Sequence, residues 1–282
     1  TNAANRLTMT TFGELTTLDS ADYDDVPSSD MMGQIFEGLY RVAANNKVEL
    51  GMAAQEPKVS EDGLVYTFTL RDAKWSDGSA VKAQDFVFTY RKLVNPQEGH
   101  VAQSADVFKN AKKIRSGELP VEELGVKALD DKTLEITLEN PAPYLPKLLT
   151  GSRFLPQSEA VAQKLGDQYG SNVSNVVVNG PFKLEGWTGS ELTWKLVKNT
   201  DYWDASNVAL NEVTVNVSKE VATSVQLFDS KQVQYTTISD QFVDQYKSQS
   251  TFHAQPKATM GYMNFNTLKP TTANQHFRRA IA

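Results

Sequence analysis

The sequence predicts an α/β fold, because segments with the pattern of strands and segments with the pattern of helices alternate along the chain. Residues 64–71 (LVYTFTLR) alternate apolar and polar side chains, as a half-buried strand does. Residues 83–93 (AQDFVFTYRKL) then place apolar side chains at helical spacing. A length of 282 residues is typical of one large or two ordinary domains, long enough to bury a real core.

The first 41 residues predict one strand and one short helix. Residues 6–12 (RLTMTTF) alternate as a strand does. Residues 28–41 begin with Ser-Ser-Asp, which favours a helix start, and continue with apolar side chains at helical spacing. These apolar side chains are Met32, Ile35, Phe36 and Leu39.

A turn is expected between the strand at residues 64–71 and the helix at residues 83–93. Residues 76–79 (SDGS) have turn chemistry, since Gly78 tolerates a positive φ. Asp85 lies in the first turn of the helix, where a negative charge favours the helix dipole. The side chains expected on the buried face of the helix are Phe86, Tyr90 and Leu93.

The rest of the chain continues the alternation. Further strands are expected at residues 124–139 (a hairpin), 179–187, 191–199, 212–218 and 261–267. Further helices are expected at residues 158–165 and 220–228, and one begins near residue 276. This last helix stops after one turn, which cannot stabilise itself in water, so the natural chain is expected to continue.

Composition excludes several classes of site. The chain has no cysteine, which excludes disulfides, cysteine-zinc sites and thiol nucleophiles. A net charge of −6 argues against a nucleic-acid surface. The chain has no run of 18 apolar residues, the length that a membrane-spanning helix needs. Its first residues lack the basic and apolar regions of a signal peptide.

Catalytic motifs are missing as well. None of the three histidines lies beside a nucleophile motif, and no phosphate loop or dinucleotide fingerprint occurs. Adjacent carboxylates occur at 24–25, 122–123 and 130–131, but such pairs are usually turn or cap residues. An enzyme is therefore the weaker hypothesis, and we expect no catalytic residues, no metal and no cofactor. Most of the four tryptophans, Trp75, Trp187, Trp194 and Trp203, should be buried, and a remainder at strand ends could line a ligand cleft.

The chain resembles the family 5 extracellular solute-binding proteins, the peptide-binding components of ABC importers, and most closely the oligopeptide binders. The resemblance is strongest over residues 53–90, with YTFTLRDAKWSDGSAVKAQDFVFTYRKL at its centre. Other matching pieces keep the order of the family: FEGLY (36–40), LGVKALDDKTLEITL (124–138), NGPFKL (179–184), KNTDYWD (198–204) and YMNFN (262–266) followed by RRAIA. Two departures stand out: Lys82 replaces a frequent capping Thr, and the tyrosine-containing loop of some members is not recognisable at 100–106.

The resemblance implies a periplasmic-binding-protein-like lobe (type II, cluster C-like) with a mixed β-sheet and an inserted α+β subdomain. Residues 1–44 and 171–265 would form the core of lobe I, residues 45–170 the inserted subdomain, and residues 266–282 a truncated crossing into a second lobe that is missing. The implied function is capture of an oligopeptide between two lobes for delivery to an ABC transporter permease.

Partners and location follow from the same resemblance. It implies an oligopeptide ligand, permease subunits as partners, no nucleic acid, and a monomer. It also implies an extracytoplasmic protein, either periplasmic or a cell-surface lipoprotein, although the lipidated cysteine of many members is not in this chain.

The resemblance places the ligand-binding residues in two segments. Asp24, Asp25, Val26 and Pro27 match the place where related proteins offer an extended backbone to the peptide. The second group, Tyr262, Asn264 and Asn266, falls at the probable hinge and could line the floor of the cleft. Both segments have a structural alternative: a polar turn before a helix, and pairing of crossing strands.

Three other functions remain open at this stage. Members of the family bind other solutes, such as nickel, haem or an oligosaccharide, on the same scaffold. A surface receptor that senses peptides would carry the same motifs. A peptide hydrolase that uses a carboxylate pair is the less favoured alternative.

Overall fold

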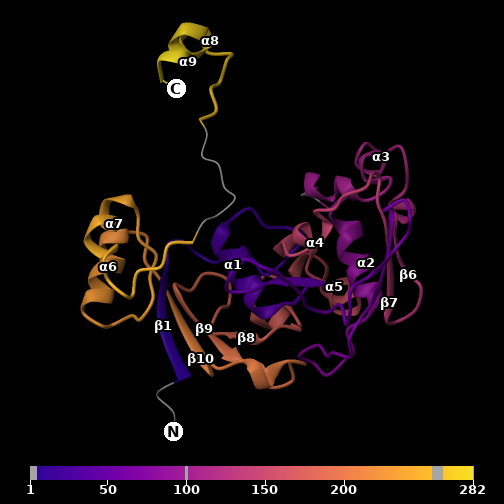
Figure 1. Cartoon of the computed structure of the whole chain (residues 1–282), viewed down its shortest axis with the longest axis horizontal. Helices are drawn as coiled ribbons and strands as arrows, with labels where there is room; N and C mark the ends of the chain where they lie inside the picture. The colour runs from indigo at the N-terminus through magenta and orange to yellow at the C-terminus, as the bar shows by residue number, and fades with distance from the viewer. Residues whose placement is uncertain (1–4, 99–100, 256–262, 282) are drawn as a thin grey trace. The chain divides into compact units, whose positions relative to one another are not determined.

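The structure is a computed structural model that describes residues 5–98, 101–255 and 263–281. The chain divides into two compact units, Thr1–Ile238 and Ser239–Ala282, and each is described by itself. Figure 1 shows the course of the chain. In the part that the structure describes, no helix is long and apolar enough to cross a membrane.

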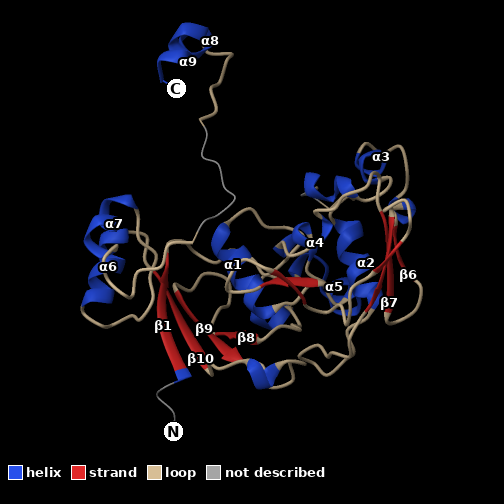
Figure 2. Cartoon of the chain, viewed as in Figure 1, coloured by secondary structure: helices blue, strands red, loops and turns tan. Residues whose placement is uncertain are grey.

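The first sheet of the larger unit combines one strand from the start of the chain with three from its later part (Figure 2). The strand order is β1 (Arg6–Thr11), β10 (Glu212–Val217), β9 (Thr193–Lys198) and β8 (Phe182–Glu185). β1 and β10 are parallel, and the other neighbours are antiparallel. The sheet is therefore mixed, as expected.

A second four-stranded sheet is antiparallel and comes from the middle of the chain, and a two-stranded hairpin accompanies it. The order in the sheet is β4 (Lys58–Val59), β5 (Val65–Thr69), β7 (Thr133–Thr137) and β6 (Val126–Ala128). The hairpin consists of β2 (Tyr40–Val42) and β3 (Val48–Leu50). The subdomain boundaries at residues 44 and 170 remain a prediction.

Short helices occur in both units. The larger unit contains α1 (Val26–Ile35), α2 (Ala83–Lys92), α3 (Ala111–Arg115), α4 (Leu145–Leu148), α5 (Glu159–Leu165) and α6 (Val221–Asp229). The smaller unit contains α7 (Asp240–Tyr246), α8 (Pro270–Ala273) and α9 (Gln275–Ile281). α2 packs against β6 and β7 (Figure 2).

The strand, turn and helix expected over residues 64–93 are confirmed. Gly78 has a φ of +88°, as the turn requires. The three apolar side chains expected on the inner face of α2 are fully buried: Phe86, Tyr90 and Leu93. Lys82 precedes α2 and makes no side-chain cap, because a lysine has no acceptor to offer.

Asp85 does more in this structure than favour the helix dipole. Its carboxylate is buried and accepts three hydrogen bonds, which connect three segments of the chain. The donors are the backbone N–H of Lys82 at 2.9 Å, the indole N–H of Trp75 at 3.1 Å and the backbone N–H of Glu159 at 3.0 Å. Asp85 thereby links α2 to the preceding strand segment and to the start of α5.

The helix expected at residues 28–41 is shorter than predicted and begins earlier. α1 begins at Val26 and ends at Ile35. The N–H of Phe36 still bonds the carbonyl of Met32, but the N–H of Glu37 pairs with another segment instead of continuing the helix. Gly180 donates its N–H to the carbonyl of Ile35 at 2.8 Å. The side chain of Asn179 bonds both the N–H and the carbonyl of Glu37, each at 3.0 Å. A Cβ at Gly180 would lie 2.5 Å from the Ile35 carbonyl carbon, so only glycine permits this approach.

The strand expected at residues 261–267 is not formed at positions 263–267, which are loop and turn. Strand formation requires a neighbour, and among the described residues no strand pairs with this segment. Residues 261 and 262 lie outside the described part of the chain. The helix that begins near residue 276 is confirmed as α9.

The core is aromatic. Three of the four tryptophans, Trp75, Trp187 and Trp194, are at most 1 % exposed, as expected for most of them. A second aromatic group surrounds Tyr90, whose ring lies 5.1 Å from Phe108 and 5.8 Å from Phe154 between centroids. Trp203 is only partly buried, but it packs under the guanidinium of Arg71 instead of lining a cleft.

Candidate functional site

The segment from Asp24 to Pro27 leads into the first turn of α1. Asp25 is the N-cap of this helix and has extended backbone angles, with φ −117° and ψ 155°. Its carboxylate accepts the Ser28 N–H at 2.7 Å and the Thr16 hydroxyl at 2.5 Å. Pro27 is buried in the first turn, where its fixed φ suits the helix. The side chains of Asp25 and Pro27 therefore shape the segment, while Asp24 and Val26 are exposed.

The backbone of Asp24 has unused hydrogen-bonding capacity. Asp24 is exposed, and within residues 5–98, 101–255 and 263–281 neither its N–H nor its carbonyl has a hydrogen-bond partner. The carbonyl of Tyr23, one residue earlier, accepts a bond from Arg153. The Tyr23 carbonyl is thus bound, whereas the backbone groups of Asp24 are open for pairing, as they are at a strand edge.

Apolar side chains are exposed around this open edge. β1 ends at Thr11, next to the end of β10, whose neighbour Ser218 donates its N–H to the Thr11 carbonyl at 2.8 Å. Beyond it, Phe12 is 54 % exposed and Val26 is 52 % exposed. Their chain neighbours Gly13 and Pro27 lie against each other. The segment therefore lies at the carboxyl end of a parallel strand pair, where open α/β sheets bind ligands.

Asn264 and Asn266, two of the residues expected at the hinge, belong to the smaller unit, which is described by itself. Asn264 is exposed, and its neighbours form no strand. The side chain of Asn266 accepts the N–H of Leu268 at 3.1 Å, a local bond that shapes the turn before α8. Tyr262 lies outside the described residues. A role for these three residues stays a prediction.

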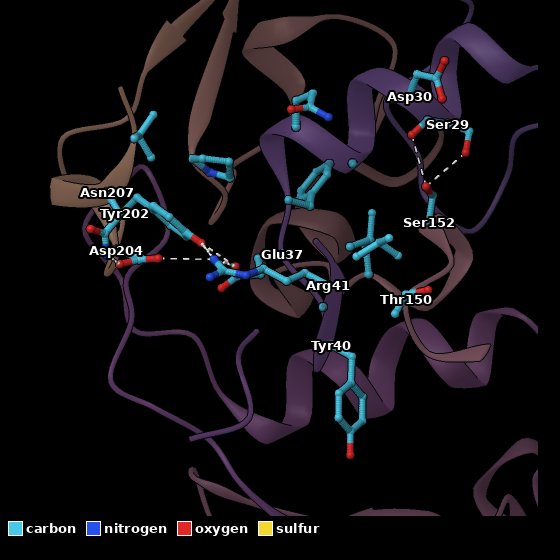
Figure 3. Close-up of a pocket in the computed structure, with 18 residues that line it drawn as sticks. Ser29, Asp30, Glu37, Tyr40, Arg41, Thr150, Ser152, Tyr202, Asp204 and Asn207 are labelled. Carbon is cyan, nitrogen blue, oxygen red and sulfur yellow. Dashed lines mark hydrogen bonds and ion pairs between the residues drawn. The ribbon is translucent and has the colours of Figure 1, made fainter. Parts of the chain in front are cut away.

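A pocket of about 560 Å³ lies beside α1 and the β2 segment (Figure 3). Ser29, Asp30 and Ser152 lie at one end of it, and a cluster of polar side chains lies at the other (Figure 3). That cluster consists of Glu37, Arg41, Tyr202 and Asp204. Sequence reasoning did not predict this pocket.

Glu37 is the centre of the polar cluster, and its side chain is 4 % exposed. It accepts hydrogen bonds from the Tyr202 hydroxyl and the Trp203 indole, and Arg41 lies 3.5 Å away. Burial raises the pKa of Glu37 above its ordinary value, although the two hydrogen bonds and Arg41 oppose that shift. Since donors surround the carboxylate, its chemistry is structural: it fastens the segment after α1 to residues 202–204.

The sequence contained a signal for this cluster. Glu37 stands in the apolar run FEGLY, and Tyr202 and Trp203 stand in DYWD, two of the pieces that carry the family resemblance. A carboxylate between apolar neighbours is expected to need buried donors. Which donors it finds depends on a separation of 165 residues, which spacing alone does not reveal.

Comparison with known proteins decides the family. Residues 47–282 match the model of the "Bacterial extracellular solute-binding proteins, family 5 Middle". The chain belongs to this family. The family resemblance and the fold class expected from the sequence are thereby confirmed. The description of the family calls its members extracellular solute-binding proteins.

Three relatives show how far the similarity extends. The dipeptide-binding protein of Lactococcus lactis is 30 % identical over 275 residues, which cover 95 % of this chain and 50 % of the relative. The structure of Listeria monocytogenes OppA bound to peptide is 36 % identical, with a TM-score of 0.83 over 88 % of this chain and 49 % of that one. The pheromone receptor PrgZ is 31 % identical, with a TM-score of 0.90 over 98 % and 56 %. The chain therefore spans about half the length of these relatives.

Proposed function

We propose that the full-length protein captures oligopeptides between two lobes and delivers them to an ABC transporter permease. The observation that carries this proposal is the open backbone edge at Asp24. A peptide that pairs with this edge would gain main-chain hydrogen bonds, as in β-strand addition. Main-chain bonds are the same for every sequence, so such a site accepts many peptides.

The surroundings of Asp24 suit this role. The exposed apolar side chains of Phe12 and Val26 offer contact area to peptide side chains without a charge that would select among them. Arg153 and Asp25 hold the segment from behind, so it does not have to become ordered on binding. We assign the binding role to the backbone of Asp24 to Val26, and the shaping role to Asp25 and Pro27.

We propose the second lobe, the location and the partners from the similarity of this chain to its relatives. Relatives of this chain are named as dipeptide-binding and oligopeptide-binding proteins, and one similar structure is that of a peptide-bound OppA. We therefore propose a second lobe that closes over the peptide, with Tyr262, Asn264 and Asn266 near the hinge. We also propose a monomer at the cell surface or in the periplasm, with permease subunits as partners.

Mass spectrometry of small molecules released from the denatured full-length protein tests this function. The expected result is a mixture of short peptides with varied sequences. Release of a nickel complex, haem or an oligosaccharide instead of peptides would contradict the proposal and favour a family member with another solute. Recovery of peptides intact, without hydrolysis products, is expected of capture and contradicts a hydrolase.

A sensing role is the second candidate, because the structure is similar to the pheromone receptor PrgZ. A receptor tuned to one signal would release one peptide sequence, whereas an importer of nutrients would release many. The same mass spectrum therefore separates the two roles.

A further inference from the structure

Arg153 holds the backbone immediately before the open edge at Asp24. Its guanidinium donates hydrogen bonds to the carbonyls of Ala21 at 3.3 Å and Tyr23 at 2.5 Å. The same guanidinium lies over the ring of Tyr23, 4.4 Å from its centroid. One side chain thus binds two carbonyls and one aromatic ring of the same short segment.

The neighbour of Arg153 holds the other end of the segment. Ser152 and Ser29 exchange hydrogen bonds: the Ser29 hydroxyl lies 3.0 Å from the Ser152 hydroxyl, which donates to the Ser29 carbonyl at 3.1 Å (Figure 3). Arg153 and Ser152 belong to one 3-10 turn, Ser152–Phe154. This turn therefore contacts the chain on both sides of residues 24–27.

The turn is itself firmly anchored. Phe154 is 2 % exposed and packs its ring against Tyr90 and Phe108. The hydroxyl of Tyr90, on α2, also donates to the carbonyl of Phe154 at 3.2 Å. Arg153 is thus mounted on a core of large aromatic side chains, which makes it a rigid support for an exposed segment.

The direction in which the backbone groups of Tyr23 and Asp24 point decides which of them a ligand can reach. In extended chain, the polar backbone groups of successive residues point to opposite sides. Asp25 has extended backbone angles, and in a chain extended through Tyr23 and Asp24 as well, the bond from Arg153 to the Tyr23 carbonyl would turn the N–H and carbonyl of Asp24 away from the 3-10 turn. Without Arg153 the segment could rotate, and the backbone groups of Asp24 would no longer be presented together.

We propose that Arg153 is a positioning residue for ligand binding: it orients the backbone of Asp24 for pairing with a peptide main chain. This inference rests on the proposed function and adds the residue that sets the geometry of the site. Arg153 does not itself touch the peptide in this proposal. Its loss should therefore weaken main-chain recognition indirectly, because the bonds between the peptide and the backbone of Asp24 are lost although Arg153 makes none of them.

The chain offers a closely matched control in Arg71. Its guanidinium also donates to two backbone carbonyls, those of Gly51 at 2.5 Å and Ala53 at 3.0 Å. It also lies over an aromatic ring, 3.6 Å from the centroid of Trp203. Arg71→Met and Arg153→Met therefore remove the same kinds of interaction at different places.

The test measures binding of tetraalanine to the full-length protein by calorimetry, together with its singly N-methylated analogues. We expect Arg153→Met to raise Kd about tenfold or more, and Arg71→Met to leave Kd within about threefold. In the unsubstituted protein, the analogue that lacks the pairing N–H should bind about tenfold more weakly than tetraalanine. In Arg153→Met the N-methylated analogue should bind almost as well as tetraalanine, because the hydrogen bond between that N–H and the Asp24 backbone is already lost. In Arg71→Met the tenfold difference should persist.

Two results would overturn the inference. One is an unchanged Kd for Arg153→Met. The other is an N-methylation penalty of full size in that variant, which would mean that Arg153 acts only on stability. Arg153→Lys, which keeps the charge but not the two-armed geometry, should restore only part of the affinity. Failure of the unsubstituted protein to bind tetraalanine would instead count against the proposed function itself.

Hydrogen exchange gives a second readout that needs no ligand. In Arg153→Met the amides of Ser28 and Ser29, which donate to Asp25, should exchange faster than in the unsubstituted protein, while those of β7 should not change. Equal exchange of these two amides in both proteins would contradict the positioning role. If Arg153→Met does not fold, Arg153→Lys is compared with Arg71→Lys in the same two measurements.

Discussion

Replacing Asp85 with alanine is expected to lower the free energy of unfolding by about 3–5 kcal/mol. The substitution removes one buried acceptor and leaves three donors without it: the backbone N–H groups of Lys82 and Glu159, and the indole of Trp75. Urea unfolding followed by tryptophan fluorescence measures the change. Asp85→Asn should have a smaller effect, since the amide oxygen still accepts but the amide nitrogen does not.

Asp131 provides the control for this first substitution. It also pairs with Lys82, through a side-chain contact of 3.0 Å, but the Asp131 side chain is 68 % exposed. Asp131→Ala should therefore cost less than about 1 kcal/mol. Equal losses for Asp85→Ala and Asp131→Ala would show that Asp85 acts as an ordinary surface charge, contrary to its burial in the structure.

Replacing Glu37 with alanine is expected to cost about 3 kcal/mol, because the hydroxyl of Tyr202 and the indole of Trp203 lose their shared acceptor in a buried place. Glu49 is the matched control. It also pairs with Arg41, at 3.6 Å, but its side chain is 51 % exposed. Glu49→Ala should change the free energy of unfolding by less than about 0.5 kcal/mol.

The effect of Glu37→Ala should also depend on pH. The pKa of Glu37 is raised in the folded protein above the ordinary 4.5, so the folded state binds a proton more tightly than the unfolded state does. The corresponding stabilisation is complete below 4.5 and is lost as the pH rises through the folded pKa. The difference between the unsubstituted protein and Glu37→Ala should therefore be larger at pH 5 than at pH 8. The opposite trend in urea unfolding would show that Arg41 and the hydrogen bonds outweigh burial.

Much of the fold could be predicted from the sequence because most elements carry their own local signal. The strand, turn and helix over residues 64–93 have a clear change of period and a glycine at the turn, and the structure forms them. The end of α1 could not be predicted locally. It depends on Asn179 and Gly180, which reach the chain at Ile35 to Glu37 from a distant segment.

The same distinction applies to the candidate site. The resemblance to the family placed ligand-binding residues at 24–27, which stays a prediction, but sequence did not show that the Asp25 carboxylate is used as a helix cap. Nor could it show that Arg153 lies behind Tyr23, because their contact joins residues 130 positions apart. Spacing reveals the elements of a fold; long-range contacts decide which side chains remain free for a ligand.

Hydrogen exchange at the Asp24 amide, measured by NMR on the full-length protein with and without tetraalanine, tests the central claim most directly. We predict that saturating peptide slows exchange of this amide about tenfold or more, because its N–H becomes hydrogen-bonded to the peptide main chain. Amides of β7 should respond much less. Tight binding of the peptide with unchanged exchange at Asp24 would contradict the claim that this backbone edge receives the ligand.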